Sequence, residues 1–462
     1  MNDLAKSYLA PIAWVDGTWA KDVLMTVASN GTWDNIQANA GNDQQRSATC
    51  LDGPVVPGLV NAHSHAFQRA MAGMTERAGD AQDNFWSWRN HMYSVANRIT
   101  PGQLEAIAAL LYAELLQAGY THVCEFHYLH HDLQGKPYAN PLDMSGALMR
   151  AAQRVGIGIT LLPALYMRSG FAASGLRDDQ QRFASTPDFI FRLCEGIRRH
   201  FGGSQMNTGL ALHSLRAVGP GALKEAAAFA RVAHMPIHIH VAEQVGEVED
   251  CLSSMGQRPV EWLLNHANVD GSWNLVHATH TTTSELQGIK DSGATIVLCP
   301  TTEANLGDGV FDLPAYVRNK GNWSIGSDSH ITRSWQEELR LLEYSQRFQL
   351  QQRNVMATAS GEPSTAAALF NAALAGGSAA CGQLMAGLAA GNRADFSVID
   401  MTSSALLGVP DDRLLDSLIF SSPDTKFTEV YVSGKQVVQA GRAKNWQGIA
   451  SDFSSAMRKL WA

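Results

Sequence analysis

Two histidines, His63 and His65, stand two residues apart at the end of the largely apolar run 57–62. Side chains alternate between the faces of an extended strand, so residues two apart project from the same face. The pair can therefore chelate a cation. Because H-x-H pairs are common, the pair alone is a weak signal, and the rest of the chain must supply further ligands.

Three more polar residues, His240, His277 and Asp328, each follow a short apolar run farther along the chain. Imidazole nitrogens and a carboxylate oxygen are ligands that a divalent cation such as zinc accepts. Any one of these residues could instead be a hydrogen-bonded core histidine or a capping aspartate, but four potential ligands at strand ends together favour a metal site. The predicted ligands of one divalent ion, for which we expect Zn²⁺, are His63, His65, His240 and Asp328. An open position for water remains if coordination expands to five.

Eight short apolar runs alternate with stretches of helical periodicity, a pattern that predicts parallel strands covered by helices. The predicted strands are 60–65, 121–128, 157–165, 208–213, 236–241, 273–277, 294–299 and 322–328. One connecting helix begins at a capping box, Thr100-Pro101-Gly102-Gln103. We therefore expect an α/β fold built on a (β/α)8 TIM-like barrel, whose chemistry lies at the carboxyl ends of the strands.

The two ends of the chain are rich in short β-type runs, unlike the middle of the chain, where such runs alternate with helical stretches. The first fifty residues hold short β-type runs separated by Asp16-Gly17 and Asn30-Gly31, and the last seventy hold strand signals at 394–400, 427–432 and 436–438. We expect the two termini to meet in one small β-sandwich domain. The predicted division is 1–56 and 385–462 for the sandwich, and 57–384 for the barrel.

The composition excludes several classes of protein. The 462 residues are 45% hydrophobic and carry 35 Lys and Arg against 43 Asp and Glu, for a net charge of −8, so a nucleic-acid partner is not expected. No run approaches the length of a membrane span, and the first residues lack the pattern of a secretory signal. Six scattered cysteines without a C-x-x-C pair indicate a reducing compartment, so we expect a cytoplasmic protein.

Together, these motifs resemble the amidohydrolase superfamily, in its branch of deaminases with one metal ion. The segments that carry the resemblance are 57–65, His240-Val241-Ala242-Glu243, His277, Ser327-Asp328 and 387–400. The fourth strand ends in Leu212-His213-Ser214, without a lysine, so the two-metal variant with a carboxylated lysine is disfavoured.

Within that superfamily, the chain most resembles the formimidoylglutamate deiminases of histidine degradation. The narrower match lies in residues 66–73, 85–89, 125–128, 213–218 and 299–309. This resemblance implies hydrolysis of an amidine carbon with release of ammonia. It also implies catalytic roles for Asp328, which would take the proton of the attacking water, for Glu243, which would pass a proton to the leaving nitrogen, and for His277, which would hydrogen-bond the reacting centre. Glu243 could instead orient a ligand imidazole, and His277 could be a fifth ligand.

The implied substrate is a small-molecule dicarboxylate, which calls for arginine donors. The resemblance assigns substrate binding to Gln68, Arg89, Tyr128, His213 and Arg216. Without the resemblance, each arginine could equally form a surface ion pair. Arg333 is a weaker third candidate, and Trp86 and Trp88 are expected to pack against the pocket or cover it.

Two alternative functions stay open at this stage. A related enzyme could deaminate a purine, pterin or triazine ring, since fold does not fix substrate. A barrel without catalytic activity could serve as a binding protein, although all the candidate residues are present. A homodimer is compatible with such a barrel, but no sequence feature marks an interface.

Overall fold

The computed structural model describes residues 6–41, 47–77, 83–421 and 427–462, and it contains two sheets of nine strands each. The first sheet forms the barrel. Its strands, in hydrogen-bonded order, are β14 (Asn322–Ile325), β13 (Thr295–Leu298), β12 (Trp273–His277), β11 (Ile237–Val241), β10 (Leu210–Ser214), β8 (Gly158–Leu165), β7 (Tyr120–His127) and β6 (Leu59–Ser64). All are parallel, and the short β9 (Met206–Thr208) pairs with β8. The eight predicted strands and the α/β barrel are confirmed.

The barrel closes between its first and last strands at the end where the predicted site lies. The Asp328 N–H donates to the His63 carbonyl at 3.0 Å, and the His65 N–H donates to the Asp328 carbonyl at 3.2 Å. Below these bonds, a β-carbon added at Gly326 would lie 2.6 Å from the His63 β-carbon. Only glycine therefore allows the two strands to approach this closely, and closing the barrel itself brings three of the predicted metal ligands together.

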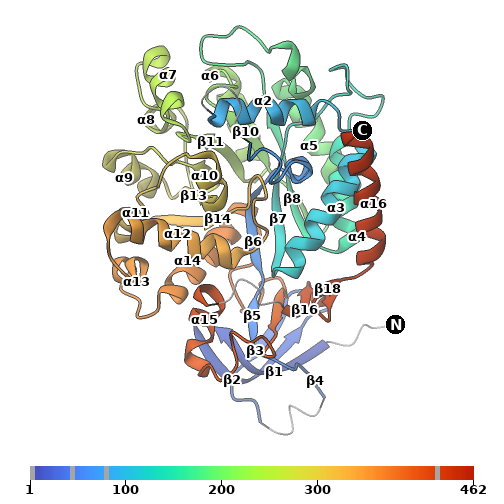
Figure 1. Ribbon diagram of the computed structural model, residues 1–462, viewed down its shortest axis with the longest axis vertical. Helices are drawn as coiled ribbons and strands as arrows, with labels where there is room; N and C mark the ends of the chain where they lie inside the picture. The colour runs from blue at the N-terminus through green and yellow to red at the C-terminus, as the bar shows by residue number, and fades with distance from the viewer. Residues whose placement is uncertain (1–5, 42–46, 78–82, 422–426) are drawn as a thin grey trace.

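Helices follow most of the strands and cover the outside of the barrel (Figure 1). These helices are α3 (Pro101–Gln117), α4 (Asp143–Val155), α5 (Pro187–Phe201), α6 (Pro220–Val232), α7 (Val245–Met255), α8 (Pro259–His266), α9 (Thr283–Ser292), α10 (Pro300–Leu306), α11 (Leu313–Arg318), α12 (Trp335–Leu350), α13 (Val355–Ser360) and α14 (Thr365–Cys381). The predicted capping box is present at the start of α3, where the Thr100 hydroxyl accepts from the Gln103 N–H and Pro101 occupies the first turn. The additional helix α2 (Phe85–Ala96) lies across the carboxyl ends of the strands.

The second sheet is mixed and is built from both ends of the chain. Its strands are β1 (Lys6–Val15), β2 (Thr18–Val27), β3 (Trp33–Gln37), β4 (Thr49–Cys50), β5 (Val55–Pro57), β15 (Phe396–Ile399), β16 (Phe427–Val432), β17 (Lys435–Gln439) and β18 (Arg442–Ala443). The antiparallel pair β5–β15 joins the N-terminal strands to the C-terminal ones. The composite β domain is confirmed, and its strands form one continuous hydrogen-bonded sheet.

The last helix, α16 (Trp446–Trp461), returns from this sheet and packs against α3 on the outside of the barrel (Figure 1). Its buried residues Ile449, Ala456 and Leu460 recur at helical spacing, so one face of the helix is apolar. The C-terminal segment therefore contacts both parts of the molecule, and the division into 1–56 with 385–462 and 57–384 stays a prediction.

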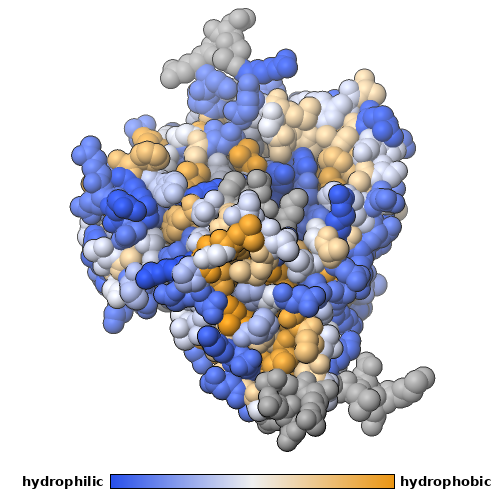
Figure 2. Space-filling model, turned by 60° about the horizontal axis from the view of Figure 1, so that its bottom comes forward, coloured by the Kyte–Doolittle hydropathy of each residue, from blue (hydrophilic) through white to orange (hydrophobic). Residues whose placement is uncertain are grey.

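The outer surface at the sheet end is mostly hydrophilic, with apolar side chains gathered in a band near its middle (Figure 2). Such exposed apolar area is normal for folded proteins. No helix in the described part of the chain combines the length and the hydropathy needed to cross a lipid bilayer.

Candidate active site

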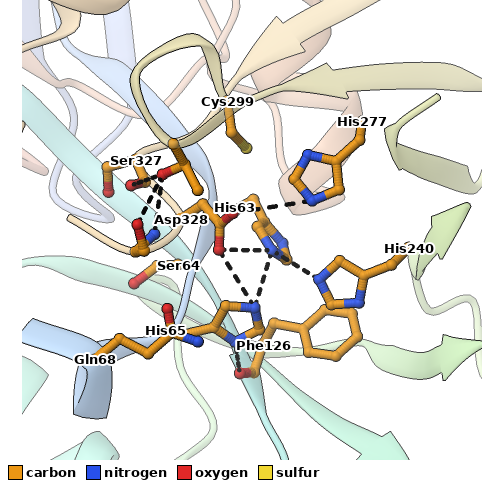
Figure 3. A network of polar contacts seen from close by, with 12 residues as sticks. His63, Ser64, His65, Gln68, Phe126, His240, His277, Cys299, Ser327 and Asp328 are labelled. Carbon is orange, nitrogen blue, oxygen red and sulfur yellow. Dashed lines mark hydrogen bonds and ion pairs between the residues drawn. The ribbon is translucent and has the colours of Figure 1, made fainter. Parts of the chain in front are cut away.

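Three imidazoles converge at the carboxyl end of the barrel (Figure 3). The Nε2 atom of His63 lies 3.1 Å from Nε2 of His65 and 3.1 Å from Nε2 of His240. All three side chains are buried; His63 lies in β6, His65 directly follows it, and His240 in β11 is 177 residues from His63. The structure therefore brings the predicted histidine ligands to one point.

The hydrogen bonds of two of these rings fix which nitrogen faces the centre. His65 Nδ1 lies 2.9 Å from the Phe126 carbonyl, and His240 Nδ1 lies 2.8 Å from the His213 carbonyl. A carbonyl oxygen only accepts, so Nδ1 carries the hydrogen in both rings and Nε2 keeps its lone pair. Burial lowers the pKa of His65 to about 3 and the pKa of His63 and His240 well below the usual range, so the rings are neutral.

The lone pairs of His65 and His240 both point at Nε2 of His63, 3.1 Å from each, and a hydrogen on that atom could satisfy only one of them, whereas a cation would satisfy both. Asp328 adds an anionic oxygen, because its Oδ1 lies 3.5 Å from His65 Nε2 and 3.6 Å from His63 Nε2. Asp328 itself has a φ of +43°, a strained conformation for a residue with a side chain. This set of three imidazole nitrogens and one carboxylate fits a divalent metal ion.

Three acidic residues surround His277, at the end of β12. Its Nδ1 lies 3.1 Å from Glu303 Oε1, and its Nε2 lies 3.7 Å from Glu243 Oε1 and 3.8 Å from Asp328 Oδ2. Burial alone would lower the pKa of His277, but the carboxylates of Glu243, Glu303 and Asp328 outweigh it and raise this pKa to about 10. His277 therefore presents an N–H at Nε2 toward Glu243 and Asp328.

Glu243 follows β11 after a tight bend, since Ala242 has a φ of +52°. This bend turns a buried carboxylate toward His277, at the edge of the cavity described below. Its position beside a protonated imidazole and three residues beyond His240 is the one expected of a group that carries a proton.

Glu303, in the first turn of α10, was not singled out from the sequence. Its Oε1 accepts the Cys299 N–H at 2.8 Å and contacts His277 Nδ1, so it orients that ring. Glu303 lies inside the motif 299–309 that carried the narrower resemblance. The only sequence signal was therefore an acidic residue in that motif, without any indication of its partner.

A small cavity of about 50 Å³ lies against the histidines. All five predicted substrate-binding residues line it: Gln68, Arg89, Tyr128, His213 and Arg216. Gln68 Nε2 donates to the Tyr128 hydroxyl at 3.3 Å, while the buried Gln68 Oε1 has no partner among the described residues. The weaker candidate Arg333 lies elsewhere and pairs with Glu114 at 3.4 Å.

Arg89 and Arg216 hold unused hydrogen-bond donors. Nε of each is buried and has no hydrogen-bond partner within the ranges that the structure describes. Both guanidinium groups lie over the Trp86 ring, with Cζ at 4.4 Å from its centroid for Arg89 and at 5.6 Å for Arg216. Two adjacent cations with free donors, Arg216 buried and Arg89 half-buried, form a site for an anionic ligand.

Trp86 gives a first prediction, because its ring holds both arginines. Replacing Trp86 with leucine should raise the KM of a dicarboxylate substrate about 5- to 30-fold, the loss of about 1–2 kcal/mol of cation–π contact, with little change in kcat. Steady-state kinetics of Trp86→Leu beside Trp86→Phe, which keeps an aromatic face, would measure this. A KM equal to that of the unmodified protein in Trp86→Leu would show that the ring does not position the arginines.

The fold and the histidine cluster define a barrel hydrolase of the amidohydrolase family. The profile of that family, described as "Amidohydrolase family", matches residues 55–437, and the chain belongs to it. The resemblance inferred from the motifs is thereby confirmed.

More particularly, the chain is 42% identical over 444 residues to the formimidoylglutamate deiminase of Pseudomonas aeruginosa, covering 96% of both chains. The crystal structure of an amidohydrolase from Brucella melitensis superimposes with a TM-score of 0.91 at 41% identity, covering 99% of this chain and 100% of that one. A 5-methylthioadenosine/S-adenosylhomocysteine deaminase of Halobacterium salinarum is 26% identical over 378 residues, 80% of this chain and 78% of that protein. A zinc-bound adenosine deaminase from Xanthomonas campestris shares the fold, with a TM-score of 0.81 at 20% identity, and covers 98% of each chain. The protein is thus an amidohydrolase and a homologue of a formimidoylglutamate deiminase.

Proposed function

We propose that this protein hydrolyses N-formimidoyl-L-glutamate to N-formyl-L-glutamate and ammonia. The observation that carries the proposal is that one cavity is lined by predicted metal ligands and by two arginines. The ligands are His65, His240 and Asp328, and the arginines are Arg89 and Arg216, whose Nε donors have no partner among the described residues. A formimidoyl group needs activated water, and the two carboxylates of a glutamate moiety need two cationic donors. The 42% identity to a deiminase of this name supports the same substrate.

The proposed cofactor is one divalent ion, Zn²⁺, held by His63, His65, His240 and Asp328. When bound at such a site, the ion supplies the Lewis acidity that lowers the pKa of water from its high bulk value toward about 7. The zinc bound to the Xanthomonas campestris adenosine deaminase, which has the same fold, supports this choice of metal.

The residues around the cluster have distinct proposed roles. Asp328 takes the proton of the attacking water, whose oxygen forms the new bond to the amidine carbon. Glu243 passes a proton to the nitrogen that departs as ammonia when the carbon–nitrogen bond breaks. His277 donates its Nε2 hydrogen to the reacting centre, where preorganised donors stabilise developing charge.

The remaining proposed roles concern substrate binding. Arg89 and Arg216 each bind one carboxylate, and Gln68, Tyr128 and His213 complete the polar lining of the cavity. All six cysteines are free thiols, which supports the prediction of a cytoplasmic enzyme. The barrel assigned to residues 57–384 would hold every one of these residues.

Product identification together with metal analysis tests the proposal. The purified protein should contain about one equivalent of zinc, release ammonia from N-formimidoyl-L-glutamate, and yield N-formyl-L-glutamate by mass spectrometry. Guanine and 5′-methylthioadenosine, assayed in parallel, should be far poorer substrates. Removal of the ion with dipicolinate should abolish turnover, and added Zn²⁺ should restore it.

Two outcomes would overturn this function. Faster ammonia release from either purine compound would identify a ring deaminase. A protein that purifies without metal and acts on none of the three compounds would support a barrel with a binding role.

A further inference from the structure

Glu247 is a buried carboxylate next to the site for which the proposed mechanism has no role. It lies in the first turn of α7 and is 1% exposed. Its Oε2 accepts the N–H of Glu243 at 3.1 Å, and Glu243 directly follows Ala242, the residue with a φ of +52°. Glu247 thereby holds the bend that presents Glu243.

The carboxylate of Glu247 also acts on Arg216 through its charge. Burial lowers the pKa of the Arg216 guanidinium, but the carboxylates of Glu247 and Glu243 outweigh this effect and raise it. No ion pair within 4.0 Å joins Arg216 to a carboxylate among the described residues, so its donors stay free for a ligand. A β-carbon added at Gly246 would lie 4.0 Å from Trp86 Cζ2, and the Arg216 guanidinium lies over the same ring. The start of α7 therefore adjoins the arginine site.

Ordinary helix capping does not account for this arrangement. In a capping box, an acidic side chain in the first turn reaches back to the N-cap residue, here Gln244. Glu247 instead reaches one residue farther, to the N–H of Glu243. Its Oε1 is buried and has no hydrogen-bond partner among the described residues, which is costly for a group that only stabilises a helix end.

We propose that Glu247 is a positioning residue that holds the bend at Ala242 and so presents Glu243 for proton transfer. This inference rests on the function proposed above.

Two substitutions test this role. Glu247→Gln keeps the length of the side chain and its acceptor for the Glu243 N–H, so both kcat and KM should stay within about threefold of the unmodified protein. Glu247→Asp keeps the charge but withdraws the acceptor by one methylene, so kcat should fall about 10- to 30-fold while KM stays within about threefold. The exposed Glu249 on the same helix provides the control, and Glu249→Gln should leave both constants unchanged.

A binding measurement that does not depend on turnover completes the test. The Kd of N-formyl-L-glutamate, measured by titration calorimetry, should stay within about threefold in both Glu247→Gln and Glu247→Asp, because neither substitution removes a donor to the ligand. Variants that change kcat and KM together, or that only lower the melting temperature, would show that Glu247 is merely structural, while the proposed function would stand. If the unmodified protein neither binds N-formyl-L-glutamate nor releases ammonia, the proposed function fails and this inference fails with it.

Discussion

Replacing Glu243 with glutamine should lower kcat for N-formimidoyl-L-glutamate by about 10²- to 10⁴-fold, the usual contribution of a positioned acid or base. Glutamine has nearly the same size and can still contact His277, but it cannot pass a proton to the leaving nitrogen. Since Glu243 is not among the four proposed metal ligands, the zinc content of Glu243→Gln should equal that of the unmodified protein. Steady-state kinetics and metal analysis on the same preparation measure both quantities.

The exposed Glu249 again supplies a matched control, because Glu249→Gln makes the same chemical change outside the cavity. Turnover in Glu243→Gln equal to that of the control would place the proton carrier elsewhere, with Asp328 as the next residue to test. Loss of zinc in Glu243→Gln would instead indicate that this carboxylate helps to hold the ion.

Replacing Arg216 with methionine should raise the KM of N-formimidoyl-L-glutamate about 10- to 150-fold, while kcat falls less. A hydrogen bond to a charged group contributes about 1.5–3 kcal/mol, and each 1.4 kcal/mol corresponds to a factor of ten. Methionine fills a similar volume without donors, so the variant removes carboxylate recognition and leaves the packing beside Trp86 largely intact. The KM and kcat measured from initial rates of ammonia release separate the two effects.

Substrate analogues make this prediction specific. N-formimidoyl-4-aminobutyrate lacks one carboxylate and N-formimidoyl-2-aminobutyrate lacks the other. For one of these two analogues, the KM of Arg216→Met should therefore equal that of the unmodified protein. Arg89→Met should show the opposite preference if each arginine binds one carboxylate. Arg333→Met serves as the control, because Arg333 pairs with Glu114 and does not line the cavity. An unchanged KM in Arg216→Met would remove Arg216 from the binding site.

Much of the fold could be read from the sequence alone. The alternation of short apolar runs with helical periodicity identified all eight barrel strands, and the turn signals at both ends identified the composite sheet. The histidines and Asp328 could also be placed at strand ends, because each follows a short apolar run in the sequence. These features follow from the two periods of strand and helix and from turn preferences, which act over a few residues and are therefore visible in the chain.

The contacts between side chains from different strands were decided only by the tertiary structure. Glu303 meets His277 from 26 residues away, Arg333 points to Glu114 instead of the cavity, and Glu247 accepts a hydrogen bond from the N–H of Glu243. Each of these outcomes depends on how the strands are staggered around the barrel and on bends such as that at Ala242. Stagger and closure are properties of the whole sheet, and no local pattern of residue types encodes them. The sequence by itself thus determined which chemical groups stand at the rim of the barrel, whereas only the closed barrel decided which of them face one another.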